Sequence, residues 1–282
     1  MPRLESMKRL LRCWFWSIPF FVVLGLILGV LVSIPVIPKP NIATINISGV
    51  IQEQAYVDSI LGMLRYARNN DSIKAVVLHI NSPGGSAGAV EQIYLDLLRL
   101  RQEKPVVASI GTMGASGGYY VAIASNFIYA EPTSFLGSVG AWSNLPSPEE
   151  LDEDIITSGP LKATGGSRRK YTGVLDTFRR QFVEAVTSQR GDRLKISEEE
   201  LSRAEIYTGS ESLRYGLIDD IGTVTAAIEK AASLAGIRQY GVVALYIPQP
   251  VTLFLFSSSD FEALKSQPSL VPLYYYLYFE QE

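Results

Sequence analysis

Two glycine-rich stretches are the part of this sequence whose residue types could do chemistry. Each follows an apolar run that predicts a buried strand and precedes a stretch of helical periodicity: 81–85 (Asn-Ser-Pro-Gly-Gly) and 114–118 (Gly-Ala-Ser-Gly-Gly). A turn from a strand into a helix presents backbone N–H groups beside the positive helix end, and glycine lets a substrate carbonyl approach closely. With Ser116 centred in the second turn, the pair predicts a nucleophile beside an oxyanion-binding backbone.

Ser116 needs a base, and histidine is not available for this role. The stretch 114–118 satisfies Gly-x-Ser-x-Gly, the nucleophile turn of α/β-hydrolases, which requires a histidine downstream of the serine. The only histidine, His79, lies upstream in the apolar run 76–80, where a packed side chain is expected. A Ser/His/Asp triad is therefore not expected. The spacing of His, Cys and carboxylates also predicts no zinc site, and we expect no metal and no cofactor.

A lysine can serve as the base of a serine protease when its amine is neutral near physiological pH. Small, apolar or hydroxylic surroundings favour the neutral amine. Lys162 fits this requirement best, since its neighbours in 158–164 are Ser-Gly-Pro-Leu before it and Ala-Thr after it. Lys170 follows two arginines, which indicates exposure. Composition favours Lys162 but leaves an ordinary surface lysine as the alternative.

The elements that must position these residues alternate between strand and helix. Apolar, β-branched runs predict strands at 42–50, 73–80, 105–110 and 126–130. Helical periodicity predicts helices at 58–68, at 87–102 and from 116, and the stretch 175–234 is predicted to be mostly helical. This alternation predicts an α/β domain with a largely parallel sheet.

An N-terminal segment has the length and composition of a membrane anchor. No charged residue occurs from Cys13 to Ile37, which is long enough to cross a hydrocarbon core of roughly 30 Å. A secretory signal peptide would carry a shorter apolar region and a small-residue cleavage site. Basic residues precede the span and only Lys39 closely follows it, which predicts a cytoplasmic N-terminus and an extracytoplasmic remainder in a single-pass protein of the cell membrane. The preceding basic residues are Arg3, Lys8, Arg9 and Arg12.

Charge and cysteine content exclude other classes. The chain carries 25 basic and 28 acidic residues without a long basic run, so nucleic acid is not an expected partner. A single cysteine, Cys13, excludes an intrachain disulfide framework. We predict a cytoplasmic N-terminus at 1–12, the anchor at 13–37, one catalytic domain at 42–240 and an apolar, aromatic tail at 241–282.

The tail contains two apolar runs, 251–256 and 270–279, and neither is long enough to span a membrane. One interpretation is a strand or helix that completes the core or a subunit interface. The other is a segment at the membrane interface or near the substrate groove, where tyrosine-rich segments occur. In the second case a deletion from Phe261 onward leaves the chemistry of Ser116 and Lys162 competent and changes membrane association or assembly.

In their order and spacing, the motifs resemble the signal peptide peptidase A family, whose protease domain has the ClpP/crotonase-like fold of repeated β-β-α units. The similarity runs from about Ile42 to Leu234 and rests on 81–85, 114–120, 137–140, 207–209 and 216–219. The resemblance implies that Ser116 is the nucleophile and Lys162 the base. Arg169 and Thr172 lie where the family often has an arginine and a threonine after its catalytic lysine. This alignment implies that Lys162, and not Lys170, corresponds to that lysine.

The resemblance also implies the supporting groups and the function. The N–H groups of Gly85 and Gly117 would form the oxyanion hole, and Ser138 would hydrogen-bond the lysine amine. The implied activity is that of a membrane-anchored serine endopeptidase that degrades signal peptides and other hydrophobic membrane-released peptides, as a homo-oligomer. Two alternatives remain: a protease that cleaves the hydrophobic tails of stomatin-like partners, and a catalytically silent scaffold that binds apolar peptides.

Overall fold

The computed structural model of the protein describes residues 19–29, 39–144, 158–159, 161–162, 165–246 and 274–277. The chain divides into two compact units, Met1–Lys39 and Pro40–Glu282. In the first unit the structure describes a helix at residues 19–29 and the final residue, Lys39. Of the predicted anchor, 13–37, only residues 19–29 are described. Within the described parts of the chain we find no helix with the length and apolar character needed to cross a membrane.

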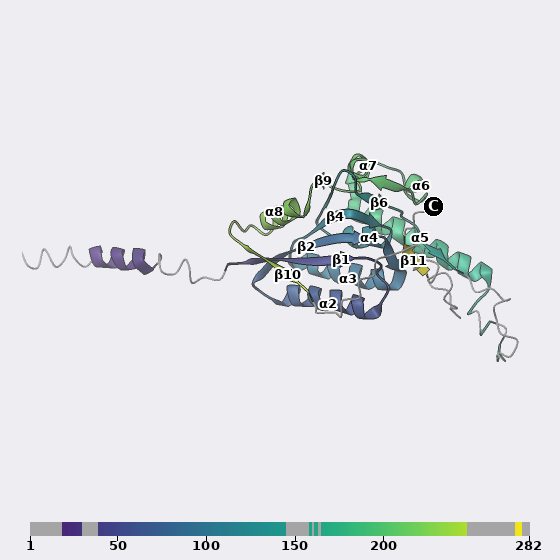
Figure 1. Cartoon of the computed structure of the whole chain (residues 1–282), viewed down its shortest axis with the longest axis horizontal. Helices are drawn as coiled ribbons and strands as arrows, with labels where there is room; N and C mark the ends of the chain where they lie inside the picture. Colours follow the sequence, from purple (N-terminus) through teal and green to yellow (C-terminus); the bar gives the residue numbers. More distant parts are fainter. Residues whose placement is uncertain are drawn as a thin grey trace, which may run out of the picture. The chain divides into compact units, whose positions relative to one another are not determined.

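An eight-stranded sheet forms the centre of the second unit (Figure 1). Its main path runs in the order β10 (Gly241–Leu245), β1 (Asn41–Ser48), β2 (Ile73–Ser82), β4 (Val106–Ala115), β5 (Phe127–Ala130) and β9 (Asp220–Ile221). Off this path, β6 (Phe135–Gly137) pairs with β4 and with β8 (Ile206–Thr208). The β6–β8 pair is antiparallel and the other described pairs of this sheet are parallel. The predicted α/β class with a largely parallel sheet is confirmed.

Helices cover both faces of the sheet because its strands are apolar on both sides. One face carries Ile45, Leu78 and Ala108 and packs into the main core. The helices that contribute most to that core are α2 (Gln54–Asn69), α3 (Ala87–Glu103), α4 (Gly117–Ala122) and α5 (Arg168–Arg190). The other face carries Ile42, Val77 and Val107 and packs against α8 (Val224–Leu234). Strands buried on both faces are near-continuous apolar runs, as 73–80 is.

Two parts of the fold differ from the sequence prediction. The strand predicted at 105–110 continues as β4 to Ala115, so that it leads directly into Ser116. The stretch predicted as mostly helical contains α5, η2 (Gly191–Arg193), α6 (Glu198–Leu201), α7 (Gly209–Tyr215) and α8, but also the short strands β8 and β9. Strands of two or three residues carry no alternation signal, and they form here because neighbouring strands of the sheet offer them a partner.

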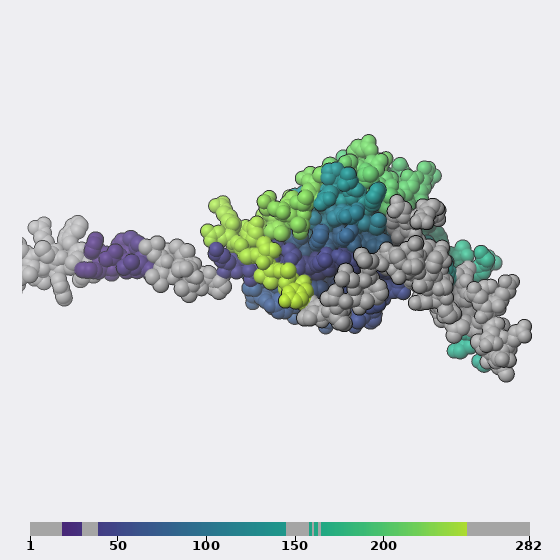
Figure 2. Space-filling view, in the orientation of Figure 1, coloured from purple at the N-terminus to yellow at the C-terminus, as the bar shows by residue number. Residues whose placement is uncertain are grey.

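The residues predicted as a tail contribute to two sheets. Gly241–Leu245 forms β10, which pairs with β1 at the edge of the central sheet and exposes Val242 and Val243 where Figure 2 shows this segment in yellow-green. Further along, β11 (Tyr274–Leu277) forms the middle of a separate three-stranded sheet. Its neighbours there are β3 (Gly84–Ser86) and β7 (Trp142–Ser143). The second segment therefore lies against the first glycine-rich turn.

Candidate active site

Ser116 lies at the junction of β4 and α4 in a strained backbone conformation. Its φ of 51° and ψ of −119° place it where a non-glycine residue is rarely found. Its N–H donates to the Gly137 carbonyl at 2.8 Å, and its carbonyl accepts from the Tyr120 N–H at 2.9 Å. The residue is 1% exposed. The strand end on one side and the helix start on the other thus hold the predicted nucleophile in a sharp turn.

Glycines bring the start of α4 against the end of β2. Ser82 pairs with Gly114, two residues before Ser116. A Cβ placed on Gly118 would come within 2.5 Å of the Ser82 carbonyl oxygen, which no side chain tolerates. The Asn81 side chain also accepts a hydrogen bond from the Met113 N–H at 3.1 Å. The two glycine-rich turns predicted from the sequence therefore meet at one edge of the sheet.

The first glycine-rich turn, residues 81–85, continues as β3. The hydrogen bonds of β3 point the Gly85 N–H away from the central sheet. The Gly84 carbonyl accepts from the Ile51 N–H at 2.8 Å, and the Ser86 N–H donates to the Ile51 carbonyl at 2.9 Å. Because neighbouring residues of a strand point their N–H groups to opposite edges, the Gly85 N–H faces the other edge, toward β11. A Cβ on Gly85 would overlap the Ile51 carbonyl. β3 also contacts α4, the helix that begins with Gly117.

A buried serine that sequence reasoning missed holds this turn. The Ser82 side chain is fully buried; it donates to the Gly49 carbonyl at 2.7 Å and accepts from the Gly84 N–H at 3.1 Å. It thereby links the loop after β1 to the residue before Gly85. The only signal in the sequence was its place inside the Asn-Ser-Pro-Gly-Gly motif, which does not distinguish a structural hydroxyl from a reacting one.

Ser138 follows β6 and lies beside the same junction. Its φ is 52°, its N–H donates to the Glu205 carbonyl at 2.8 Å, and it is half-buried. The preceding Gly137 pairs with Ala115 and accepts the hydrogen bond from Ser116. The residue directly before Ser138 therefore makes a backbone hydrogen bond with Ser116.

Lys162 is not brought into contact with these residues. It lies exposed in a turn, where its N–H donates to the Gly159 carbonyl at 3.0 Å. Within the described residues, no hydrogen bond joins its Nζ to Ser116 or Ser138. The alternative, Lys170, is exposed on α5 and its Nζ donates to the Gly165 carbonyl at 3.3 Å. The structure thus gathers the serine, the glycines and Ser138, and the choice of lysine stays a prediction.

His79 lies too far along the sheet to serve Ser116. It is half-buried in β2 and pairs with Ser109 of β4. Ser109 precedes Ser116 by seven residues, which corresponds to about 23 Å along an extended strand. This geometry agrees with the interpretation of His79 as a packed side chain.

A buried ion pair fixes the C-terminal end of α5, the helix that begins shortly after Lys162. Arg190 donates to both carboxylate oxygens of Asp219 at 3.0 Å, and the two side chains are 2% and 6% exposed. Arg193 and the Ile128 N–H also donate to Asp219, at 2.9 and 2.8 Å. Nearby, burial raises the pKa of Tyr119, whose hydroxyl donates to the Leu217 carbonyl at 2.7 Å. Asp219 thereby ties α5 to the sheet.

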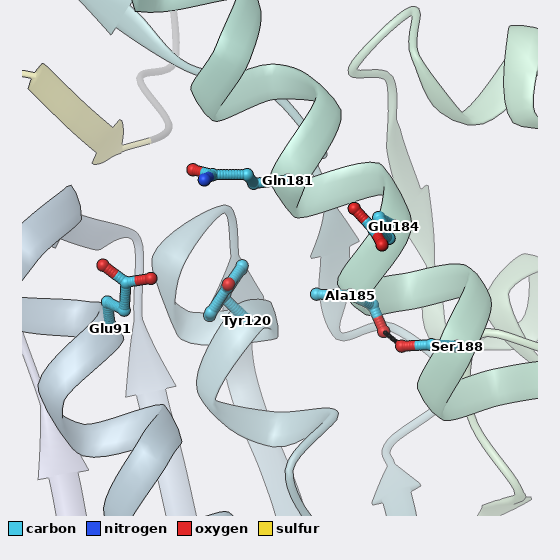
Figure 3. Close-up of a pocket in the computed structure, with 6 residues that line it drawn as sticks. All are labelled: Glu91, Tyr120, Gln181, Glu184, Ala185 and Ser188. Atoms are coloured by element: carbon cyan, nitrogen blue, oxygen red, sulfur yellow. Dashed lines mark hydrogen bonds between the residues drawn. The ribbon is translucent and has the colours of Figure 1, made fainter.

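An open hollow of about 250 Å³ lies between α3, α4 and α5 (Figure 3). Glu91 of α3 and Glu184 of α5 line it from opposite sides (Figure 3), and the other lining residues are Tyr120, Gln181, Ala185 and Ser188. Ser116 is not among its lining residues. The hollow borders α4 at Tyr120 and is not part of the candidate active site.

Two family models match the chain. The model for Clp protease matches residues 41–132, and the model for peptidase family S49 matches residues 99–238. A mutant of the 1510-N membrane-bound stomatin-specific protease has a similar fold, with a TM-score of 0.50 and 18% identity over 76% of this chain and 100% of that chain. Fold and family-model matches together define the class, a ClpP-like α/β fold of the kind that these peptidase models describe.

Curated relatives identify the family within that class. Protease 4 of Haemophilus influenzae is 33% identical over 71% of this chain and 36% of its own length. The Synechocystis protein slr0021, provisionally named a protease, is 30% identical over 71% of this chain and 76% of its own length. The chain belongs to peptidase family S49, the signal peptide peptidase A family. It spans about a third of the length of the Haemophilus relative.

Proposed function

We propose that this protein is a serine endopeptidase in which Ser116 is the nucleophile and Lys162 the general base. The observation that supports this most is the backbone of Ser116, a buried serine held at a φ of 51° between the end of a strand and the start of a helix. Such conformations persist only where the surroundings enforce them, and they cluster at active sites. The meeting of this turn with the glycines of β3 adds the backbone donors that acyl transfer requires.

In the proposed reaction, the neutral amine of Lys162 accepts the proton of the Ser116 hydroxyl as Oγ attacks the substrate carbonyl carbon. The carbonyl oxygen becomes negatively charged and accepts hydrogen bonds from the N–H groups of Gly85 and Gly117. The lysine ammonium then gives its proton to the leaving amine as the peptide bond breaks, which leaves an ester on Ser116. The same amine activates water to hydrolyse that ester and restore the enzyme.

The proposed substrates are hydrophobic peptides such as signal peptides, acted on by a membrane-anchored homo-oligomer. The helix of residues 19–29 supports the anchor because its large apolar side chains are exposed: Phe20 by 62%, Phe21 by 65% and Leu26 by 64%. A helix that is apolar on all sides is typical of a membrane span or a buried core. The substrate class and the oligomer are carried over from the family resemblance.

Peptide hydrolysis by the purified full chain in detergent tests the proposal. Ser116→Ala and Lys162→Ala should each lower kcat/KM for a fluorogenic apolar peptide by at least ~10³-fold, and the double variant should lose little more, because nucleophile and base act as one unit. Lys170→Ala is the matched control and should retain activity. If Lys162→Ala retained substantial turnover while Lys170→Ala did not, the base would be Lys170. If all variants melted normally and the wild type hydrolysed nothing, the scaffold alternative would stand.

A further inference from the structure

The strand that leads into Ser116 contains two extra residues. Up to Ile110, β4 pairs one-to-one with β2, and Ile80 lies opposite Ile110. The next partners in the register are Ser82 and Gly114, so β2 advances by two residues while β4 advances by four. Such an insertion is a β-bulge, which bends the strand that contains it. Bulges are frequent beside active sites, where they redirect a side chain.

The bulge is the place where β4 changes its neighbour. Before the bulge, residues 107–110 pair with β5, and after it, residues 113–115 pair with β6. The last residue of β6 is Gly137, whose carbonyl accepts from the Ser116 N–H at 2.8 Å, and Ser138 follows directly. The bulge therefore sets which residues of β4 lie beside β6, and hence where Ser116 stands relative to Ser138.

Two side chains hold the bulge, one at each end. Asn81 is the single residue of β2 between Ile80 and Ser82, and its Oδ1 accepts from the Met113 N–H at 3.1 Å. Ser134, in the loop between β5 and β6, donates to the Gly111 carbonyl and accepts from the Glu131 N–H at 3.0 Å. Ser134 is buried, whereas Asn81 is exposed. The Asn81 bond can therefore be removed without opening the core.

We propose that Asn81 is a positioning residue for the nucleophile: its side-chain carbonyl fixes the bulge of β4 and thereby the place of Ser116 beside Ser138. This inference rests on the proposed function, since the place of Ser116 affects a rate only if Ser116 attacks the substrate. Without Asn81, water can bond the half-buried Met113 N–H, so the fold loses little while the end of β4 gains freedom. A misplacement of 1 Å can cost about 10²-fold in rate, and we expect this partial loosening to lower kcat about tenfold.

Steady-state hydrolysis of a fluorogenic apolar peptide by the purified full chain in detergent tests the role, with kcat taken at the alkaline plateau of each pH profile. Asn81→Ala should lower kcat about tenfold, leave KM unchanged and melt at nearly the wild-type temperature. Asn81→Asp keeps an oxygen that can accept from Met113 and should restore kcat. Asn46→Ala is the matched control and should keep the wild-type kcat, because Asn46 is also exposed, on β1, and its Oδ1 accepts from the Ser48 hydroxyl at 2.9 Å.

Hydrogen exchange followed by mass spectrometry separates this inference from the proposed function, because it does not depend on activity. The amides of residues 111–116 should exchange about fivefold faster in Asn81→Ala than in the wild type, and at the wild-type rate in Asn81→Asp and Asn46→Ala. Unchanged exchange or unchanged kcat in Asn81→Ala would overturn the inference, as would an Asn81→Asp protein as slow as Asn81→Ala. Faster exchange in Asn81→Ala, when the wild type hydrolyses no peptide, would support the hold of Asn81 on the bulge and count against the proposed function.

Discussion

Ser82→Ala is the substitution that best probes how β3, which carries the proposed oxyanion donor Gly85, is held in place. The change removes one hydroxyl that donates to the Gly49 carbonyl at 2.7 Å and accepts from the Gly84 N–H at 3.1 Å. The Gly84 N–H is buried, and leaving such a donor without a partner costs about 1–3 kcal/mol. The Gly49 carbonyl is partly accessible, so water can replace its partner at smaller cost. We expect a loss of about 2 kcal/mol in the free energy of unfolding.

The same change should slow the chemistry because it loosens the residue before Gly85. A shift of the proposed oxyanion donor, the Gly85 N–H, by a fraction of an ångström would weaken its bond to the transition state, and removal of one such donor costs about 10²-fold or more in rate. We therefore expect the acylation rate of Ser82→Ala to fall by about tenfold, with the protein still folded at 25 °C.

Denaturant unfolding and the rate of acylation by an activated ester measure the two effects. Ser48→Ala is the matched control, since Ser48 is exposed and its hydroxyl bonds only to the side chain of Asn46 among the described residues. It should change stability by less than about 0.5 kcal/mol. A Ser82→Ala protein with wild-type stability and acylation rate would refute the role assigned to this hydroxyl.

Three further predictions concern the surroundings of the site. Gly118→Ala places a methyl group 2.5 Å from the Ser82 carbonyl oxygen and should destabilise the protein by about 1–3 kcal/mol in denaturant unfolding, whereas Gly88→Ala on α3, with nothing within 4 Å, should be neutral or stabilising. Asp219→Asn leaves the buried Arg190 without its carboxylate partner and should lower stability by about 3 kcal/mol or more by the same assay; a change below 1 kcal/mol would show that the ion pair does not anchor α5. Hydrogen bonds from the Thr208 backbone and hydroxyl lower the pKa of Glu211, so its contribution to stability is present above the usual carboxyl pKa and is lost as pH falls through the lowered one. The excess Tm of the wild type over Glu211→Gln should therefore shrink on acidification, and a constant difference across pH would contradict it.

The sequence predicted the central strands well because their apolar, β-branched runs are long and local. The helices α2 and α3 were predicted for the same reason, since their apolar residues recur at helical spacing within one segment. The two glycine-rich turns could be placed together because parallel strands bring their carboxyl ends to one edge of the sheet. The tight approach of Gly118 to Ser82 is the physical reason for the glycine there.

Other features depend on partners far away in the sequence. β11 forms only because β3 and β7 offer it two edges, and its four residues carry no signal that names those partners. The role of Ser82 depends on the loop after β1, which no local pattern reveals. Lys162 was chosen from its small and apolar neighbours, and the described residues show it exposed, so that choice still rests on composition and family resemblance.

Labelling with a fluorophosphonate, located by peptide mass mapping, is a direct test of whether Ser116 is the nucleophile. We expect the label to reach Ser116 faster as pH rises from 7 to 10, because the amine of Lys162 must be neutral to accept the proton. Labelling should be absent in Ser116→Ala, greatly slowed in Lys162→Ala and retained in His79→Gln, and Ser138→Ala should shift the pH profile upward. A folded wild-type protein that takes no label on Ser116 at any of these pH values would contradict it.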